Sequence, residues 1–222
     1  MNAAGSRRSE LRVEGSDDKH ALIHLLIRHG VEYENEPWPA DLPKVEEASG
    51  KDGVMGGIKD AVQLGTGLTM GFVLDANDSL EGRWQSISNQ LRSAGIADMP
   101  PIIPPTGYIG FSEKFRTRVG VWLMPDNRTQ GALERFLETL IDDGNALFVH
   151  ARQSTTEAKA TGARFSARDG DKAALHTWLA WQEEPGRPYG VAIRARYFGH
   201  ESEEAIGFVD WFRRLYLSDR GT

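Results

Sequence analysis

The chain has 222 residues, 40% of them hydrophobic, which is enough for one well-packed domain. Its formal net charge is −6, so bound nucleic acid would need a local basic patch, metal ions or a partner to offset phosphate repulsion. The lack of cysteine excludes disulfides, thiolate zinc sites and a cysteine nucleophile.

The sequence also favours a cytoplasmic protein. No apolar run approaches the roughly 20 residues that span a bilayer, so we expect no membrane partner. The polar N-terminus, MNAAGSRRSE, lacks the apolar core of a signal peptide. We expect residues 1–9 to be a disordered lead-in and residues 10–220 to form a single α/β domain.

The first predicted elements are a strand and a helix joined by an acidic turn. Residues 11–13 form a short apolar strand that ends at Glu14. Ser16 or Asp17 can cap a helix, and apolar residues then recur at helical spacing up to Gly30, which is placed to end it.

The next stretch contains the most hydrophobic strand of the chain. Residues 31–43 predict a loop, 44–48 a strand and 53–64 a short helix. Residues 68–74, LTMGFVL, are continuously apolar, as expected for a strand buried on both faces, and they end at Asp75.

A second buried strand follows a helix and a proline-rich segment. Residues 80–94 have a helical pattern, and the prolines after residue 98 predict a loop excursion near 98–117. Residues 119–124, VGVWLM, form the strand and lead into Pro125 and Asp126.

One predicted helix follows the strand at 119–124. From about residue 146 onward the chain is predicted to be helical. The predicted helices cover residues 130–141, 146–160, 169–182 and 201–217. Strands alternate with helices, which predicts a Rossmann-like α/β fold with a mainly parallel central sheet and helices on both faces.

Three acidic residues lie at the C-terminal ends of apolar strands: Glu14, Asp75 and Asp126. The carboxyl ends of strands in an open α/β sheet line the crevice where ligands bind. Carboxylates gathered there repel one another unless a cation lies between them, and hard oxygen ligands suit Mg²⁺ or Mn²⁺. The sequence therefore predicts an Mg²⁺ or Mn²⁺ site at this edge.

Asp18 is a further candidate ligand, because it lies four residues after Glu14 at a strand-to-helix junction. Each of these residues also has a purely structural interpretation. Asp17 or Asp18 can cap the helix and favour its dipole. Asp75 can begin a turn with Ala76, Asn77 and Asp78. The metal interpretation depends on the combination of motifs in this order.

The stretch Val13-Glu14-Gly15-Ser16-Asp17-Asp18 resembles the first motif of Toprim domains, the fold of topoisomerases, primases and OLD-type nucleases. Asp75-Ala76-Asn77 occupies the place of their second motif, D-x-D. With GVWLMPDNRTQGALERFL and LAWQEEPGRPYG, these segments look like an uncharacterised family of bacterial Toprim-like proteins over residues 11–215. One departure is that Asn77 replaces the second acid, with Asp78 beside it.

The resemblance implies further roles. Glu134 or Asp126 would help hold a second metal ion, with Asn77 or Asp78, and Lys172 would stabilise phosphate charge in the transition state. The structural alternatives are a solvated first-turn glutamate and an ordinary exposed lysine.

These patterns lead to three functional hypotheses. The first is a metal-dependent nuclease acting on DNA or RNA, in which Glu14 and Lys172 are catalytic. The second is a non-catalytic Toprim module that acts as a sensor or as the partner of a separate ATPase. The third is an α/β protein that binds a nucleotide or phosphometabolite. The sequence leaves the oligomeric state open, including a homo-oligomer.

Overall fold

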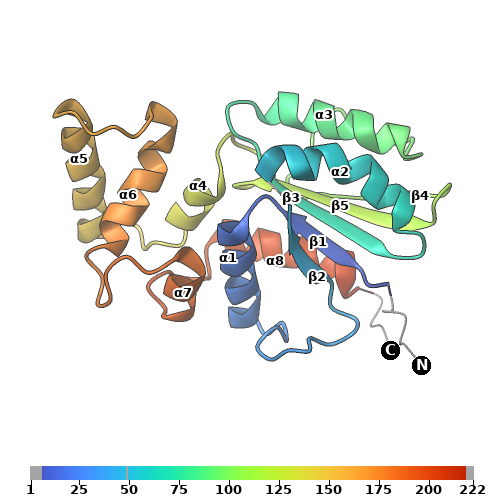
Figure 1. Ribbon diagram of the computed structural model, residues 1–222, viewed down its shortest axis with the longest axis horizontal. Helices are drawn as coiled ribbons and strands as arrows, with labels where there is room; N and C mark the ends of the chain where they lie inside the picture. The colour runs from blue at the N-terminus through green and yellow to red at the C-terminus, as the bar shows by residue number, and fades with distance from the viewer. Residues whose placement is uncertain (1–6, 49, 219–222) are drawn as a thin grey trace.

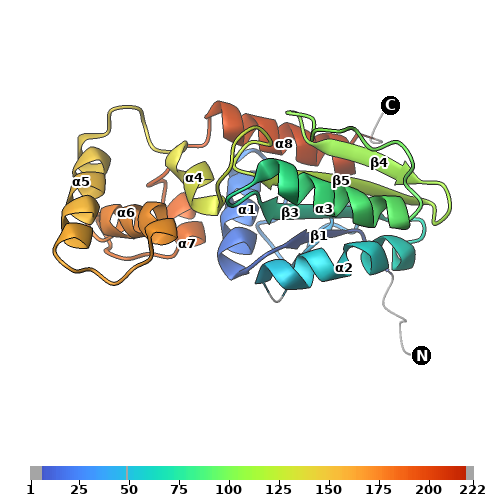
Figure 2. The same ribbon diagram turned by 90° about the horizontal axis from the view of Figure 1, so that it is seen from above.

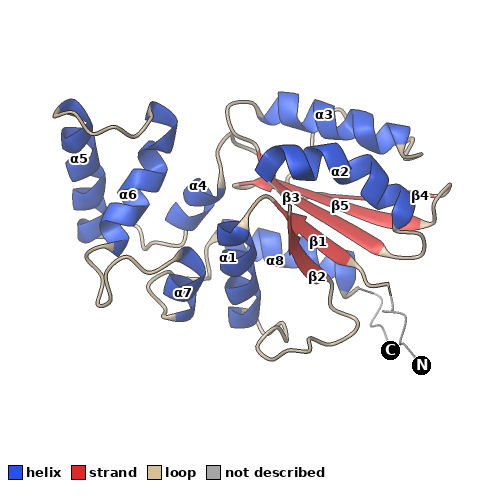
Figure 3. Ribbon diagram, in the orientation of Figure 1, coloured by secondary structure: helices blue, strands red, loops and turns tan. Residues whose placement is uncertain are grey.

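The structure, a computed structural model, describes residues 7–48 and 50–218 (Figures 1 and 3). The strands are β1 (Glu10–Val13), β2 (Lys44–Glu47), β3 (Thr69–Asp75), β4 (Tyr108–Ser112) and β5 (Thr117–Met124). The helices are α1 (Ser16–Arg28), α2 (Gly50–Leu64), α3 (Leu80–Ser93), α4 (Leu133–Glu138), α5 (Ala146–Ala160), the 3₁₀ turn η1 (Ala167–Asp169), α6 (Gly170–Leu179), α7 (Tyr189–Arg194) and α8 (Glu203–Tyr216).

The five strands form one sheet in the order β2-β1-β3-β5-β4. β2, β1, β3 and β5 are parallel, and only the edge strand β4 runs antiparallel to its neighbour β5. The parallel strands therefore end at one edge of the sheet, with β1 and β3 adjacent. This confirms the predicted α/β fold with a mainly parallel central sheet.

The sheet is covered on both faces, with α2 and α3 on one and α1 and α8 on the other (Figures 1 and 2). Alternate residues of β3 divide between these two cores. Met70, Phe72 and Leu74 join the α2–α3 core, whereas Val73 joins the α1–α8 core. A strand buried on both faces must be apolar throughout, which explains the uninterrupted hydrophobic run.

Two glycines let α8 lie directly on the sheet. Gly71 and Gly120 are paired in register on β3 and β5. A β-carbon on Gly71 would clash with Tyr216, and one on Gly120 would clash with Leu215. Both partners belong to the last turn of α8, so this close approach fixes where the helix crosses the sheet.

Helices α4 to α7 extend beyond the carboxyl ends of the strands (Figure 1). Within this group α5 packs against α6, where the rings of Phe148 and Trp178 lie 6.2 Å apart. α7 packs against α1 at Gly190, where a β-carbon would come within 2.8 Å of the His20 carbonyl carbon. These contacts place the group directly over the edge where β1 and β3 end.

Two predicted segments differ from the structure. The loop expected near 98–117 contains strand β4, because the prolines end at Pro105 and the following residues pair with β5 as an edge strand. The helix expected at 130–141 begins only at Leu133, because Gly131 has a φ of 148° and forms a β-bridge with Asn77.

The segment 189–200, which had no predicted helix, contains α7.

Most of the predicted disordered lead-in at 1–9 lies outside the described residues. Ser9 accepts a hydrogen bond from the Thr69 nitrogen at 3.0 Å, and the Arg8 Nε donates one to the Leu42 carbonyl at 2.6 Å. In the part of the chain described, no helix combines the length and apolar character needed to cross a bilayer.

Candidate functional site

Glu14 and Asp75 meet where two neighbouring parallel strands end. Glu14 follows β1 directly, and Asp75 is the last residue of β3. The Glu14 Oε1 accepts a hydrogen bond from the Asp75 backbone nitrogen at 3.1 Å. The structure therefore brings these two sequence-predicted residues together, as their position after adjacent strands requires.

Asp18 joins them from the first turn of α1. It is buried, with 9% of its surface exposed, and its Oδ2 accepts a hydrogen bond from the Gly15 nitrogen at 3.1 Å. The residue thus caps the helix, as the structural interpretation expected, and it also lies close enough to Glu14 and Asp75 for its charge to act on them. The two interpretations are compatible in one side chain.

Glu134 enters the same group through the start of α4. The Asp75 Oδ1 accepts a hydrogen bond from the Leu133 nitrogen at 3.1 Å, and the Asn77 nitrogen donates one to the Gly131 carbonyl at 2.7 Å. These two bonds hold the beginning of α4 against the end of β3. We call the resulting set of carboxylates, Glu14, Asp18, Asp75 and Glu134, the acidic cluster.

The acidic cluster is electrostatically strained without a cation. Burial, followed by the charges of Asp18, Glu14 and Glu134, raises the pKa of Asp75 to about 8. Burial, followed by the charges of Glu14 and Glu134, raises the pKa of Asp18 to about 7. Near neutral pH these two acids therefore carry protons that a surface aspartate would have lost.

Lys172 is the positive residue beside the acidic cluster. Its Nζ lies 3.2 Å from the Glu134 Oε1, and its side chain is about half exposed. Burial lowers the pKa of Lys172, but Glu134, Asp17 and Asp169 outweigh that effect and hold the pKa above its ordinary value. The lysine is thus charged and positioned by an acid of the cluster.

Asn77 and Asp78 lie on the exposed turn between β3 and α3. Asn77 has a φ of 53°, and Asp78 forms an ion pair with Arg168 at 2.7 Å. The charges that perturb Asp18 and Asp75 most come from the acidic cluster itself. The turn therefore places these two residues beside the cluster, more exposed than its carboxylates.

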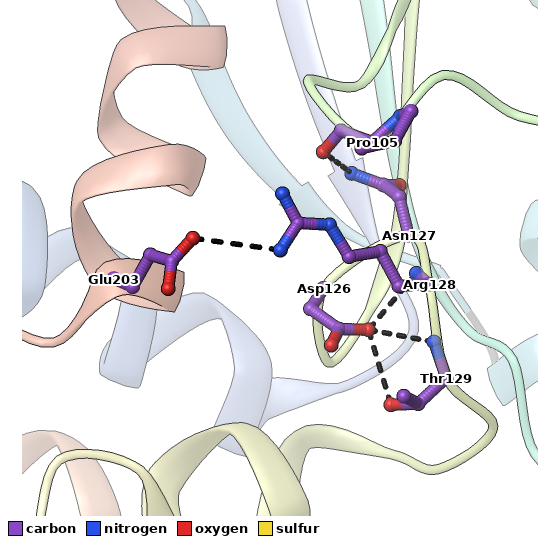
Figure 4. A network of polar contacts seen from close by, with 6 residues as sticks. All are labelled: Pro105, Asp126, Asn127, Arg128, Thr129 and Glu203. Atoms are coloured by element: carbon purple, nitrogen blue, oxygen red, sulfur yellow. Dashed lines mark hydrogen bonds and ion pairs between the residues drawn. The ribbon is translucent and has the colours of Figure 1, made fainter.

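The Asp126 side chain stabilises the turn that follows β5 (Figure 4). Its Oδ1 accepts hydrogen bonds from the Arg128 nitrogen at 2.9 Å and from the Thr129 nitrogen at 2.8 Å. The Arg128 side chain reaches away to Glu203 at 3.5 Å. The sequence offered Glu134 or Asp126 as a ligand of a second metal ion. The structure places Glu134 in the cluster, whereas the Asp126 carboxylate holds the turn after β5.

Two residues near the cluster were not found from the sequence. Tyr189 of α7 is buried, and its hydroxyl lies 3.3 Å from the His176 Nε2. Burial, with the charges of Glu134 and Asp17, raises the pKa of Tyr189 above its ordinary value. No motif marked these residues, because their place depends on how α7 packs against α1.

The donor chemistry of the cluster fits Mg²⁺ or Mn²⁺. Carboxylate oxygens are the ligands these ions prefer, and a cation would relieve the repulsion that raises the pKa of Asp18 and Asp75. Among residues 7–48 and 50–218, no group of three or more His, Cys, Asp or Glu side chains is already arranged to hold an ion.

Comparison with known proteins gives one family. The family model described as "Protein of unknown function (DUF3226)" matches residues 8–217, a range that contains every residue of the acidic cluster and Lys172. Neither the curated proteins nor the solved structures contain a match.

Proposed function

The chain belongs to the DUF3226 family, and we propose that it is a metal-dependent phosphoryl-transfer enzyme that cleaves phosphodiester bonds of DNA or RNA. The observation that carries the proposal is that four carboxylates, from the end of β1, α1, β3 and α4, gather at the carboxyl edge of the sheet, close enough for their charges to act on Asp75. The resemblance of the first two motifs to Toprim domains supports the same chemistry.

In this proposal Glu14, Asp18 and Asp75 hold Mg²⁺ or Mn²⁺, and Glu134 is the candidate for a further ligand. When bound, the ion would polarise the phosphodiester and lower the pKa of an attacking water. The hydrogen bond donated by the Leu133 nitrogen orients the Asp75 carboxylate, and the one donated by the Asp75 nitrogen orients the Glu14 carboxylate.

Lys172 supplies the positive charge that the protein itself brings to the phosphate. Glu134 holds the ammonium group beside the other carboxylates of the cluster through their ion pair. A cation fixed in this way stabilises the negative charge that develops on phosphate oxygens in the transition state. This arrangement also explains the position of a half-exposed lysine over an acidic site.

The test is Mn²⁺-dependent nicking of supercoiled plasmid, run in parallel on tRNA. We expect Glu14→Gln to reduce cleavage by at least about a hundredfold, because it removes a charged metal ligand. The matched control is Asp60→Asn, which removes one exposed carboxylate from α2. Cleavage that survives Glu14→Gln, or that falls equally in Asp60→Asn, would contradict the proposal.

A non-catalytic module is the second candidate, and the β3–α3 turn favours it. The second acid of the D-x-D motif is replaced by Asn77, and Asp78 is already paired with Arg168 on the surface. Asparagine and aspartate both tolerate the left-handed φ of this position, so Asn77→Asp should fold normally.

This substitution separates the two candidates. If Asn77 limits metal binding, Asn77→Asp should increase Mn²⁺-dependent nicking severalfold, because it adds a charged ligand beside the cluster. If Asp78 already serves as that ligand, Asp78→Asn should abolish nicking and Asn77→Asp should change it little. A non-catalytic module would show no nicking in any of these variants.

A further inference from the structure

A polar cavity adjoins the acidic cluster on the side of α3. It has a volume of about 310 Å³ and is lined by the β3–α3 turn, the first turns of α3, and Arg168 of η1. Arg83 and Arg168 reach it from two different elements. Two guanidinium groups converging on one cavity are typical of sites that bind phosphate.

Arg83 is the more informative of the two arginines. It is half-buried in the first turns of α3. Within the described residues its guanidinium has no hydrogen-bond or ion-pair partner. A guanidinium without a partner can bind an anion at no cost in existing contacts, and this cavity is where such an anion would lie.

The ion pair between Arg168 and Asp78 is weak. Its side chain is 81% exposed and that of Asp78 is 66% exposed, and ion pairs between exposed groups contribute little to stability. Exchanging the Asp78 carboxylate for a phosphate oxygen would therefore cost little. Asp78 itself lines the cavity and repels an incoming anion, so its charge should weaken the site.

Two lining residues of the cavity lie close along the chain to residues of the proposed active site. Asn77 lies two residues after Asp75, and Arg168 lies four residues before Lys172 on one continuous helical segment. Four helical residues rise roughly 6 Å, so the two side chains start from positions about one helical turn apart. Arg168 and Lys172 are therefore placed to contact different phosphates of the same strand.

We infer that this cavity binds a backbone phosphate of the same nucleic-acid strand whose neighbouring phosphate is held at the acidic cluster, with Arg83 and Arg168 as its ligands. The inference rests on the proposed function for the second phosphate. It also explains how a chain with a net charge of −6 grips nucleic acid, since the positive charge is concentrated beside the site.

The test is the affinity of a fluorescein-labelled single-stranded 12-mer, as DNA and as RNA, measured by fluorescence anisotropy without divalent metal. Arg83→Gln should weaken binding about fivefold at low salt and reduce the salt dependence by about one ion, because one phosphate contact is lost. Asp78→Asn should instead tighten binding about twofold, because it removes the repelling charge. A merely structural role for Asp78 would not produce tighter binding.

The matched control is Arg92→Gln, which removes the same charge from an exposed position on the same helix, outside the cavity. Equal effects of Arg83→Gln and Arg92→Gln, or no measurable binding by the wild-type protein, would overturn the inference. So would competition by inorganic phosphate or AMP at the affinity of the 12-mer, since that result would indicate a mononucleotide pocket.

The outcome separates this inference from the proposed function. If Arg83→Gln weakens strand binding but no Glu14-dependent cleavage exists, the cavity binds nucleic acid and the nuclease proposal fails. If cleavage depends on Glu14 but Arg83→Gln behaves like Arg92→Gln, the nuclease proposal stands and the phosphate site fails.

Discussion

Without divalent metal, the protein should lose stability as the pH rises from about 4 to about 8, and Asp18→Asn/Asp75→Asn should remove most of that loss. Both acids have folded-state pKa values above the ordinary 3.8, so the folded state binds more protons than the unfolded state across this range. Their stabilising protons are fully present below pH 4 and are lost as the pH passes 7 to 8.

The size of the effect should be on the order of 3 kcal/mol between pH 5 and pH 8. It should be smaller than the sum of the two separate shifts, because one proton relieves the repulsion felt by both acids. The measurement is urea unfolding with EDTA at both pH values, for the wild type and for the double variant.

Two controls sharpen this prediction. Asp60→Asn should keep the wild-type pH dependence, because its carboxylate is exposed on α2. Saturating Mg²⁺ should stabilise the wild type at pH 8 far more than the double variant, because a ligand that binds only the folded state raises its stability. Parallel pH profiles for the wild type and the double variant would show that the cluster is not strained.

Gly190→Ala should destabilise the protein by about 2 kcal/mol or more, because it forces α7 away from α1. The added β-carbon would lie 2.7 to 2.9 Å from atoms of His20, two of which belong to the main chain and cannot rotate away. The shift would also displace Tyr189, the neighbour of Gly190 in the same helix. Urea unfolding measures the loss.

Gly170→Ala is the matched control, since Gly170 is also helical but has open space around the position of a β-carbon. There the substitution should stabilise the protein by up to about 1 kcal/mol through helix propensity. Equal effects at the two glycines would mean that the α1–α7 contact is not tightly packed.

The sheet could be predicted because the sequences of its central strands are distinctive. Strands β3 and β5 are continuous apolar runs, and their position after helical patterns leaves a parallel arrangement as the simplest solution. Strand β4 was missed because an edge strand needs only short, weakly alternating sequence, and its identity comes from pairing with β5.

The acidic cluster was partly predictable for a similar reason. Residues that directly follow adjacent parallel strands meet at one edge, and this placed Glu14 and Asp75 correctly. The choice between Glu134 and Asp126 was not accessible, because both follow the same strand. It depends on how the turn after β5 folds, with the Asp126 carboxylate bonded to Arg128 and Thr129.

The path of the chain after β5 has a consequence for synthesis of the protein. The polypeptide leaves the sheet, forms α4 to α7 and only then returns as α8 over Gly71 and Gly120. Since translation proceeds from the N-terminus, all five strands emerge from the ribosome while part of one apolar face is still bare. Trp122 lies under α8. Its side chain therefore stays uncovered until roughly eighty further residues have been synthesised. During that interval the nascent chain exposes this apolar surface, which favours aggregation, and α8 is the segment that covers it.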